Sequence, residues 1–351
     1  MRRIGTLGGW ALPACAAARL GRCIRSGLLC AVGALAFATP AWAGEEPPAS
    51  SPASSLDLMQ LPLEQLLELR VSGASQFEQK ISDAPSAVVV LTAADIRNYH
   101  WRTLADALAS LPGLYVFYDR NYAYLGARGF LKPGDYDSRF LLLVDGNRLN
   151  DSVYDEATIG SEFILDVDMI ERIEYVPGPG SAIYGPNAFF GVINVVTRKG
   201  SQIGGAEAAL EAGSFGERKG RASYGWHGAG GADAVVSATV YDNPGRDQYY
   251  AEFDTPQQNH GVAHGLDYDR AQQYLAQASY DGFSLTAAHS SRTKGIPTAS
   301  YGQLFDDARS QTVDAQGFVD LAYSGSLAPR LQLSAHAFWN RYDYIGDYVY
   351  S

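Results

Sequence analysis

The sequence predicts an α+β domain followed by antiparallel β-strands of the type that crosses a membrane. Residues 83–200 mix short helical patterns with β-branched runs. Residues 201–351 alternate apolar with polar residues in segments of about ten, which is typical of transmembrane β-strands. The 37 glycines and 22 tyrosines among 351 residues favour strands and turns over a helical bundle. With 46% hydrophobic and 19% charged residues, the composition is that of a folded protein.

The charge and the cysteines exclude several classes of function. The chain carries 27 Lys and Arg against 38 Asp and Glu, a net charge of −11, and it has no basic tract. Such a chain is a poor binder of nucleic acid, so no nucleic-acid partner is expected. The three cysteines, Cys15, Cys23 and Cys30, all precede residue 44. Residues 44–351 therefore have no disulfide frame, no thiolate metal site and no cysteine nucleophile.

Residues 1–43 have the pattern of a secretory signal peptide. The segment holds five arginines and no acid, an apolar run from Gly27 to Ala38, and a small-x-small site at Ala41-Trp42-Ala43. We expect cleavage after Ala43, which would make Gly44 the mature N-terminus. The alternative is a retained membrane anchor, but the apolar run is shorter than the roughly 20 residues that a helical span needs.

Residues 44–82 are predicted to be a flexible N-terminal segment. Gly44 to Ser55 is rich in Pro, Ser, Ala and Glu, as linkers are. Leu56 to Leu69 places leucines at roughly helical spacing, so it is either a short amphipathic helix or a linker that orders on contact.

Residues 83–200 are predicted to form a compact domain of short helices and strands. Thr103 is a suitable N-cap for a helix over 104–111, with Asp106 in its first turn. Asp145-Gly146 between two apolar runs indicates a hairpin with a type I′ turn. The sequence further indicates a short helix at 95–99 and strands at 86–92, 114–118, 140–144, 147–149, 170–176 and 192–197.

Residues 201–351 are predicted to contain about seven transmembrane strands. Short connections at 227–232, 281–282 and 325–330 alternate with long ones at 243–272 and 293–314, as the periplasmic turns and outer loops of bacterial barrels do. The alternative is a soluble β-sandwich. Residues 44–351 hold no uncharged apolar run of 18 residues, so strands are the means of crossing a membrane. The strands are expected at 206–213, 218–226, 233–242, 273–281, 283–292, 315–324 and 331–342.

Five stretches of the α+β region carry a resemblance to a known family. They are DAPSAVVVLTAADIRNY from Asp83, TLADALASLPGLYV from Thr103, GARGF from Gly126, LLLVDGNRLND from Leu141, and IERIEYVPGPGSAIYGPNAFFGVINVVTRKG from Ile170. On these residues the chain resembles the plug domain of TonB-dependent outer-membrane receptors. The resemblance covers residues 70–200 and is weaker beyond, where EAGSFGER from Glu211 fits the first outer hairpin. Its structural motif falls on Gly178, Gly180, Tyr184, Gly185, Asn187, Gly191 and Asn194.

The resemblance implies a fold and a function. It implies a plug domain inside a barrel, here the first seven or so of a family barrel of 22 strands, so we expect the chain to be the N-terminal part of a receptor. It also implies a receptor for proton-gradient-driven uptake of a scarce nutrient, such as an iron–siderophore complex, haem or cobalamin. The implied partners are TonB with its inner-membrane energising complex, the small-molecule nutrient and outer-membrane lipid. The implied location is the outer membrane of a Gram-negative bacterium. The alternative is a truncated, secreted plug that acts as a binding module without a barrel.

The resemblance also suggests two sites. The energy-coupling TonB box is expected within Leu69, Arg70, Val71, Ser72, Gly73, Ala74 and Ser75, because small residues after Val71 let another backbone approach as an added strand. A plain linker is the alternative. Nutrient contacts are expected from loops at the apex of the plug, at Tyr118, Arg120, Tyr122 and Tyr136. The alternative is that these tyrosines pack against the barrel wall.

No enzyme, cofactor or metal is expected. The glycines near residue 180 do not fit a dinucleotide fingerprint, because Ile183 stands where a third glycine is needed. His260 and His264 have the spacing of a zinc-protease helix but lack its glutamate, since Gly261 follows His260. His100 is interpreted as a capping or surface residue rather than a ligand.

Overall fold

The computed structural model of this chain describes residues 70–71, 79–80, 87–180, 184–328 and 331–350. All of them belong to one compact unit. The predicted signal peptide, the leucine-rich stretch 56–69 and residues 72–75 lie outside the described residues. Within the described ranges, no helix is both long enough and apolar enough to cross a membrane.

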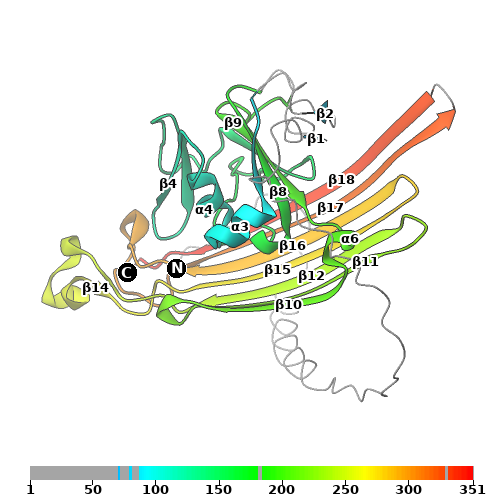
Figure 1. Ribbon diagram of the computed structural model, residues 1–351. Helices are drawn as coiled ribbons and strands as arrows, with labels where there is room; N and C mark the ends of the chain where they lie inside the picture. Colours follow the sequence, from blue (N-terminus) through cyan, green and yellow to red (C-terminus); the bar gives the residue numbers. More distant parts are fainter. Residues whose placement is uncertain (1–69, 72–78, 81–86, 181–183, 329–330, 351) are drawn as a thin grey trace, which may run out of the picture. The chain divides into compact units, whose positions relative to one another are not determined.

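The α+β domain is built on a five-stranded sheet with the order β3-β8-β9-β6-β7. Figure 1 labels β8 and β9 of this sheet. Its strands are β3 (Val89–Thr92), β6 (Phe140–Val144), β7 (Asn147–Arg148), β8 (Ile170–Pro177) and β9 (Gly191–Thr197). Neighbours are antiparallel except for β6 and β9, which are parallel. These elements confirm the predicted strands to within a few residues.

Local sequence signals set the turns and caps of this domain. Asp145 and Gly146 join β6 to β7 with φ values of 48° and 83°, the two positive values that a type I′ turn requires. Helix α4 (Leu104–Ala109) starts at the N-cap Thr103 in a capping box with Asp106, as predicted. Helix α3 (Ala93–Tyr99) also starts with a capping box, formed by Thr92 and Asp95.

The remaining elements of the domain are short. The predicted strand β4 (Leu114–Tyr118) pairs with β5 (Ala123–Ala127), which the sequence analysis did not predict. The 3₁₀ turn η3 (Val167–Met169) precedes β8, and α6 (Gly200–Ile203) follows β9. The two-residue strands β1 (Arg70–Val71) and β2 (Gln79–Lys80) pair with each other.

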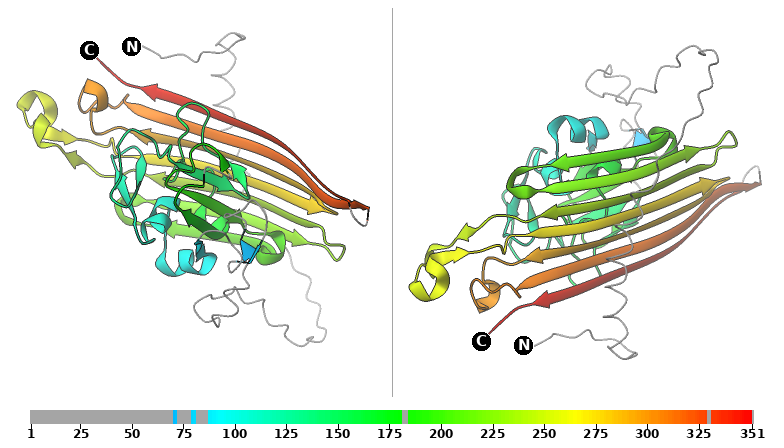
Figure 2. Two further views of the ribbon diagram at one scale, coloured as in Figure 1. Left: turned by 90° about the horizontal axis from the view of Figure 1, so that it is seen from above. Right: turned by 90° about the horizontal axis from the view of Figure 1, so that it is seen from below.

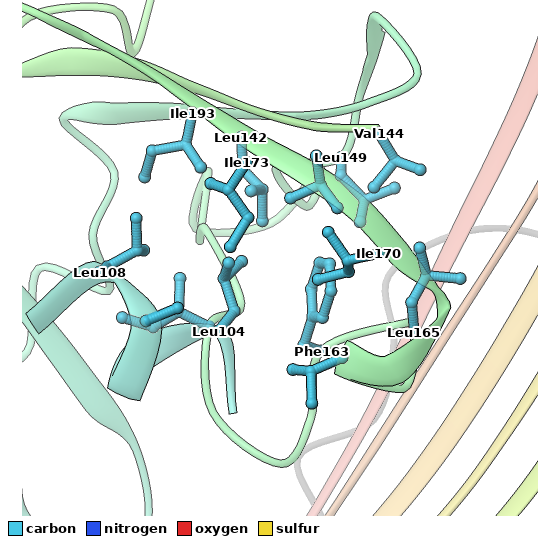
Figure 3. Packing of buried hydrophobic residues seen from close by; sticks show 14 of the residues in the cluster. Leu104, Leu108, Leu142, Val144, Leu149, Phe163, Leu165, Ile170, Ile173 and Ile193 are labelled. Carbon is cyan, nitrogen blue, oxygen red and sulfur yellow. The ribbon is translucent and has the colours of Figure 1, made fainter. Parts of the chain in front are cut away.

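Strand β6 lies at the centre of the core and is buried along its whole length. Leu142 packs with Leu104 and Ile173 in the main cluster on one face of the sheet (Figure 3). Leu141 and Leu143 join a smaller cluster on the other face. Burial on both faces explains why this strand reads as a continuous apolar run rather than an alternating one.

Residues 205–347 form a second, seven-stranded antiparallel sheet, here called the wall. Its strands neighbour one another in sequence order, which confirms the seven predicted strands (Figure 2). The long connections 244–268 and 296–310 lie at one end of the wall. The strands are β10 (Gly205–Ala212), β11 (Arg218–His227), β12 (Asp233–Asn243), β15 (Asp269–Tyr280), β16 (Phe283–Gly295), β17 (Gln311–Ala328) and β18 (Leu331–Asp347).

The connections carry small elements of their own. The first long one holds the pair β13 (Gln248–Tyr249) and β14 (Val262–Ala263) with the 3₁₀ segments η5 (Ala251–Phe253) and η6 (Pro256–Gly261). The turn η4 (Ser214–Gly216) joins β10 to β11, and η7 (Ser300–Gly302) lies in the second long connection.

The wall has the reverse polarity of a sheet in a water-soluble protein. In β12, Ser237 and Thr239 are buried, whereas Val236 before them and Val240 after them are each 53% exposed. Strands β11, β16 and β17 continue the pattern. Buried polar side chains of the wall include Arg221, Ser223, Thr286, Ser290, Arg292, Thr312, Asp314, Gln316 and Asp320. Exposed apolar ones include Tyr224, Trp226, Leu285, Val319, Leu321, Leu333 and Trp339.

Candidate ligand face and its attachment to the wall

The loop between β4 and β5, residues 119–122, is the centre of the candidate site and is here called the apex loop. Asp119 closes it, because its carboxylate accepts the backbone N–H groups of Asn121 at 2.8 Å and Tyr122 at 2.7 Å. Arg120 lies between them in the left-handed region, with φ at 76°. A residue other than glycine is strained in this backbone conformation and keeps it where the surrounding structure fixes it.

Three hydrogen bonds fix the apex loop to the wall. Arg292 on β16 donates to the Asn121 carbonyl at 2.5 Å. Thr312 on β17 donates to the Asn121 side-chain oxygen at 3.0 Å. The Tyr122 hydroxyl donates to the Asp314 carboxylate, also on β17, at 3.0 Å. The loop is therefore held by two neighbouring strands of the wall.

Arg292 lies among carboxylates from both parts of the structure. Its side chain is 1% exposed and approaches Asp269 at 3.3 Å, Asp314 at 3.6 Å and Glu162 of the α+β domain at 3.7 Å. Its guanidinium also lies over the ring of Tyr122, 5.6 Å from the centroid. A charge buried this deeply is tolerated because it is paired and hydrogen-bonded.

Tyr122 is placed as a support rather than as an exposed contact. It is buried, and its hydroxyl and that of Tyr342 both donate to Asp314. Burial, reinforced by the Asp314 carboxylate, raises the pKa of the Tyr122 phenol. The hydroxyl therefore stays protonated and remains a donor at physiological pH.

Tyr118 and Arg120 are the predicted site residues that remain open. Tyr118 is 44% exposed. The Arg120 guanidinium lies 3.6 Å from the Asp267 carboxylate, in the long connection 244–268. The structure thus brings a cation of the apex loop to a loop of the wall.

Tyr136 is the centre of a group of aromatic side chains. Its ring is stacked on Tyr154 at a centroid distance of 5.2 Å and lies edge-on to Tyr122 at 5.8 Å. Burial, with a hydrogen bond to Tyr301 of the second long connection, raises the pKa of the Tyr136 phenol. Members of this tyrosine cluster are Tyr122, Tyr124, Tyr136, Tyr154, Tyr301 and Tyr348.

Of the tyrosine cluster, the sequence analysis predicted Tyr122 and Tyr136 as site residues. Tyr154, Tyr301 and Tyr348 were not predicted, although each lies outside the regular strands. The signal available was the unusual number of tyrosines, 22 in all, together with their occurrence in loops and at strand ends.

The glycines and asparagines of the 178–194 motif hold backbone rather than a ligand. Gly178, Gly185 and Asn187 have φ values of 94°, 77° and 73°. A Cβ at Gly191 would lie 2.6 Å from the Tyr175 ring, so this position admits no side chain. A Cβ at Gly180 would lie 3.1 Å from Val192 Cγ2. Tyr184 lies next to Gly180 and packs against the smaller apolar cluster.

The side chain of Asn194, on β9, makes hydrogen bonds to the β6–β7 turn and to a carboxylate on β8. Its side-chain oxygen accepts the Gly146 N–H at 3.1 Å, which fixes the β6–β7 turn. Its amide donates to the buried Glu174 at 3.1 Å, and Glu174 also accepts from Arg172 at 2.9 Å. A polar side chain inside the sheet is thus satisfied on both sides.

A second group of charges joins the α+β domain to the wall. Lys219 on β11 donates to Asp166 at 3.1 Å and Asp168 at 3.2 Å. The buried Arg221 pairs with Glu207 at 2.6 Å, and Arg198 pairs with the same carboxylate at 3.0 Å. Arg102 also pairs with Glu217, in the turn between β10 and β11.

Of the predicted coupling segment 69–75, the structure describes Arg70 and Val71. These residues form β1, with Arg70 opposite Lys80 and Val71 opposite Gln79. Leu69 and residues 72–75 lie outside the described residues.

His100 lies at a helix end, and His260 and His264 lie on the surface beside carboxylates. His100 is the C-cap of α3 with φ at 53°, a position where glycine is usual. His264 pairs with Asp247 at 2.7 Å, and His260 lies 3.8 Å from Asp254, both on the surface. In the part of the chain that the structure describes, no cluster of His, Cys, Asp and Glu is arranged to hold a metal ion.

Comparison with known proteins identifies the α+β domain. A family model described as "TonB-dependent Receptor Plug Domain" matches residues 80–192, which contain strands β3 to β8, the start of β9, both capped helices and the apex loop. The α+β domain is a plug domain of this kind. The plug and the wall together have the fold of part of a TonB-dependent receptor.

Two curated relatives match the chain in part. The vitamin B12 transporter BtuB of Vibrio vulnificus (strain CMCP6) is 28% identical over 274 residues, which are 76% of this chain and 41% of that protein. An iron-regulated outer membrane virulence protein of Vibrio cholerae is 34% identical over 139 residues, 38% of this chain and 21% of that protein. The chain thus spans less than half the length of these relatives.

Solved structures share the fold at low sequence identity. The ferric yersiniabactin uptake receptor FyuA of Yersinia pestis has a TM-score of 0.57 at 14% identity, covering 76% of this chain and 42% of that one. The ferric-catecholate import receptor Fiu of E. coli K12, in its open form, has a TM-score of 0.56 at 15% identity, covering 78% and 41%.

We predict that Tyr122→Phe weakens the attachment of the plug to the wall. Removing a hydrogen bond to a buried carboxylate costs about 1.5–3 kcal/mol. The measurement is the urea concentration at which the plug becomes sensitive to protease in the folded protein. Tyr115→Phe on β4 is the control, since Tyr115 is 38% exposed, and we expect it to change stability by less than about 0.5 kcal/mol. Equal shifts of this urea concentration in the two variants would contradict the role of Tyr122 in attaching the plug to the wall.

Proposed function

We propose that this chain is part of an outer-membrane receptor that binds a scarce nutrient on the apex of its plug and takes it up with energy from the proton gradient. The observation that carries the proposal is the reversed polarity of the wall. Its apolar face is exposed, its polar face is covered by a plug, and a tyrosine-rich surface lies on that plug beside the long connections.

The apolar face supports a membrane location. Each fully exposed Val, Leu or aromatic side chain favours an apolar environment by about 1.5–3 kcal/mol, so a face lined with them is unfavourable in water. Lipid supplies that environment, and antiparallel strands satisfy their backbone groups within the sheet. A soluble sandwich would instead bury its apolar face against a second sheet.

The apex supports binding of a small molecule. Tyr118, Tyr136 and Arg120 combine flat aromatic surfaces, hydroxyl groups and one cation, which are the groups that orient a ligand in a protein site. Relatives named as a vitamin B12 transporter and as ferric siderophore receptors share the family or the fold. The proposed ligand is accordingly an iron chelate, haem or cobalamin.

We predict that Tyr118→Ala, Arg120→Gln and Tyr136→Ala each weaken nutrient binding by about tenfold, equivalent to about 1.4 kcal/mol. The protein, expressed from its whole reading frame, is titrated in outer membranes with cyanocobalamin, haem, ferric yersiniabactin and a ferric catecholate. Arg97→Gln, on the exposed side of α3, is the matched loss of a cation and should leave affinity unchanged. Unchanged affinity in all three apex variants, for a probe that binds the parent, would refute the proposed ligand face.

Energy coupling is proposed to act through residues 69–75, with TonB and its inner-membrane complex as partners. The support is the position of this segment directly before the plug and the extended pairing of Arg70 and Val71 with β2. A segment that already pairs as a strand can pair with another backbone in the same way, through main-chain hydrogen bonds.

We predict that Val71→Pro abolishes energised uptake and leaves nutrient binding intact, because proline removes a backbone donor and fixes φ. The measurement is uptake of the bound probe into whole cells, beside its equilibrium binding to membranes. Val71→Ile keeps the donor and should transport like the parent. Normal uptake by Val71→Pro would place the coupling segment elsewhere.

A further inference from the structure

We infer that Arg292, a residue of the barrel wall, positions the apex loop and so sets the geometry of the ligand face. This inference rests on the proposed function, since it takes the apex as the place where the nutrient binds. Arg292 itself is 1% exposed in its side chain, so it acts through the loop and does not touch a ligand.

Arg292 contacts the apex loop next to its strained residue, Arg120. Arg120 holds a left-handed backbone, and Arg292 donates to the carbonyl of the next residue, Asn121, at 2.5 Å. Thr312 holds the side chain of Asn121 at 3.0 Å. A strained residue keeps its conformation where its neighbours are fixed, so these bonds determine where the Arg120 side chain points.

The charges around Arg292 make its role specific. One guanidinium faces three carboxylates, those of Glu162, Asp269 and Asp314. With a neutral residue in its place, these carboxylates repel one another and the bond to the loop is lost. Lysine is a poor substitute, because its ammonium cannot present the fork of donors that reaches carboxylates and a carbonyl together.

Arg221 provides a matched control within the same interface. Its side chain is 4% exposed and it also lies between acidic residues of plug and wall, at 3.7 Å from Asp168 and 2.6 Å from Glu207. It lies on β11 and donates hydrogen bonds to Glu207, Ser223 and Met169 rather than to the apex loop. If Arg292 merely braced the plug, Arg221→Gln would have the same effect as Arg292→Gln.

The test uses a spin label at Tyr118→Cys. Residues 44–351 contain no native cysteine, and any other cysteine of the expressed protein is replaced by serine. The protein, expressed from its whole reading frame, is labelled in outer membranes and its electron paramagnetic resonance spectrum is recorded. We expect the rotational correlation time of the label to fall about threefold or more in Arg292→Gln and Arg292→Lys, as in a loop released from its anchor. Arg221→Gln should leave it unchanged.

A milder variant keeps the test valid if Arg292→Gln does not fold. Thr312→Val removes one of the two bonds to Asn121 without adding volume, and it should give an intermediate increase in mobility. An unchanged spectrum in Arg292→Gln or in Thr312→Val, or an equal change in Arg221→Gln, would overturn the inference.

Binding of cyanocobalamin separates this inference from the proposed function. If Arg292 acts through Arg120, then Arg292→Gln combined with Arg120→Gln loses no more affinity than Arg120→Gln alone. Additive losses of affinity would overturn the inference. A parent protein that binds none of the nutrient probes would count against the proposed function, and the spin-label comparison would still decide the role of Arg292.

Discussion

The burial of polar side chains on the inner face of the wall is the constraint on which the rest of the structure depends. A sheet that exposes Val236 and buries Ser237 is stable where its outer face meets an apolar medium and its inner face finds polar partners. The plug supplies those partners. Lys219 meets Asp166 in one part of the interface, and Arg292 meets Glu162 in another.

The same polar interface gives the plug its position and the apex its shape. The apex loop is the point where a tight turn, closed by Asp119, is bonded to two neighbouring strands. Tyr122 uses its hydroxyl for this attachment, which leaves Arg120 in the loop and Tyr118 at the end of β4 as the more exposed groups. The proposed ligand surface is thereby built on a loop held by a rigid sheet, an arrangement that would limit the entropy lost on binding.

The sequence was most informative where local chemistry decides the structure. The cap at Thr103, the turn at Asp145-Gly146 and the seven alternating strands were all predictable, because each depends on neighbouring residues or a short period. The attachment of Tyr122 was not predictable, because Asp314 is 192 residues away in the chain. Its two interpretations, ligand contact or packing on the wall, have identical sequence signals.

Labels on the two faces of β12 show which face of the wall meets lipid. Single cysteines at Val236 and Ser237 are labelled with a fluorophore in folded protein in vesicles that contain lipids with a quenching group on the acyl chain. We expect strong quenching at position 236 and little at 237, since adjacent residues of a strand point to opposite faces. Quenching at 237 and not at 236, or at neither, would contradict a wall that faces lipid outward and the plug inward.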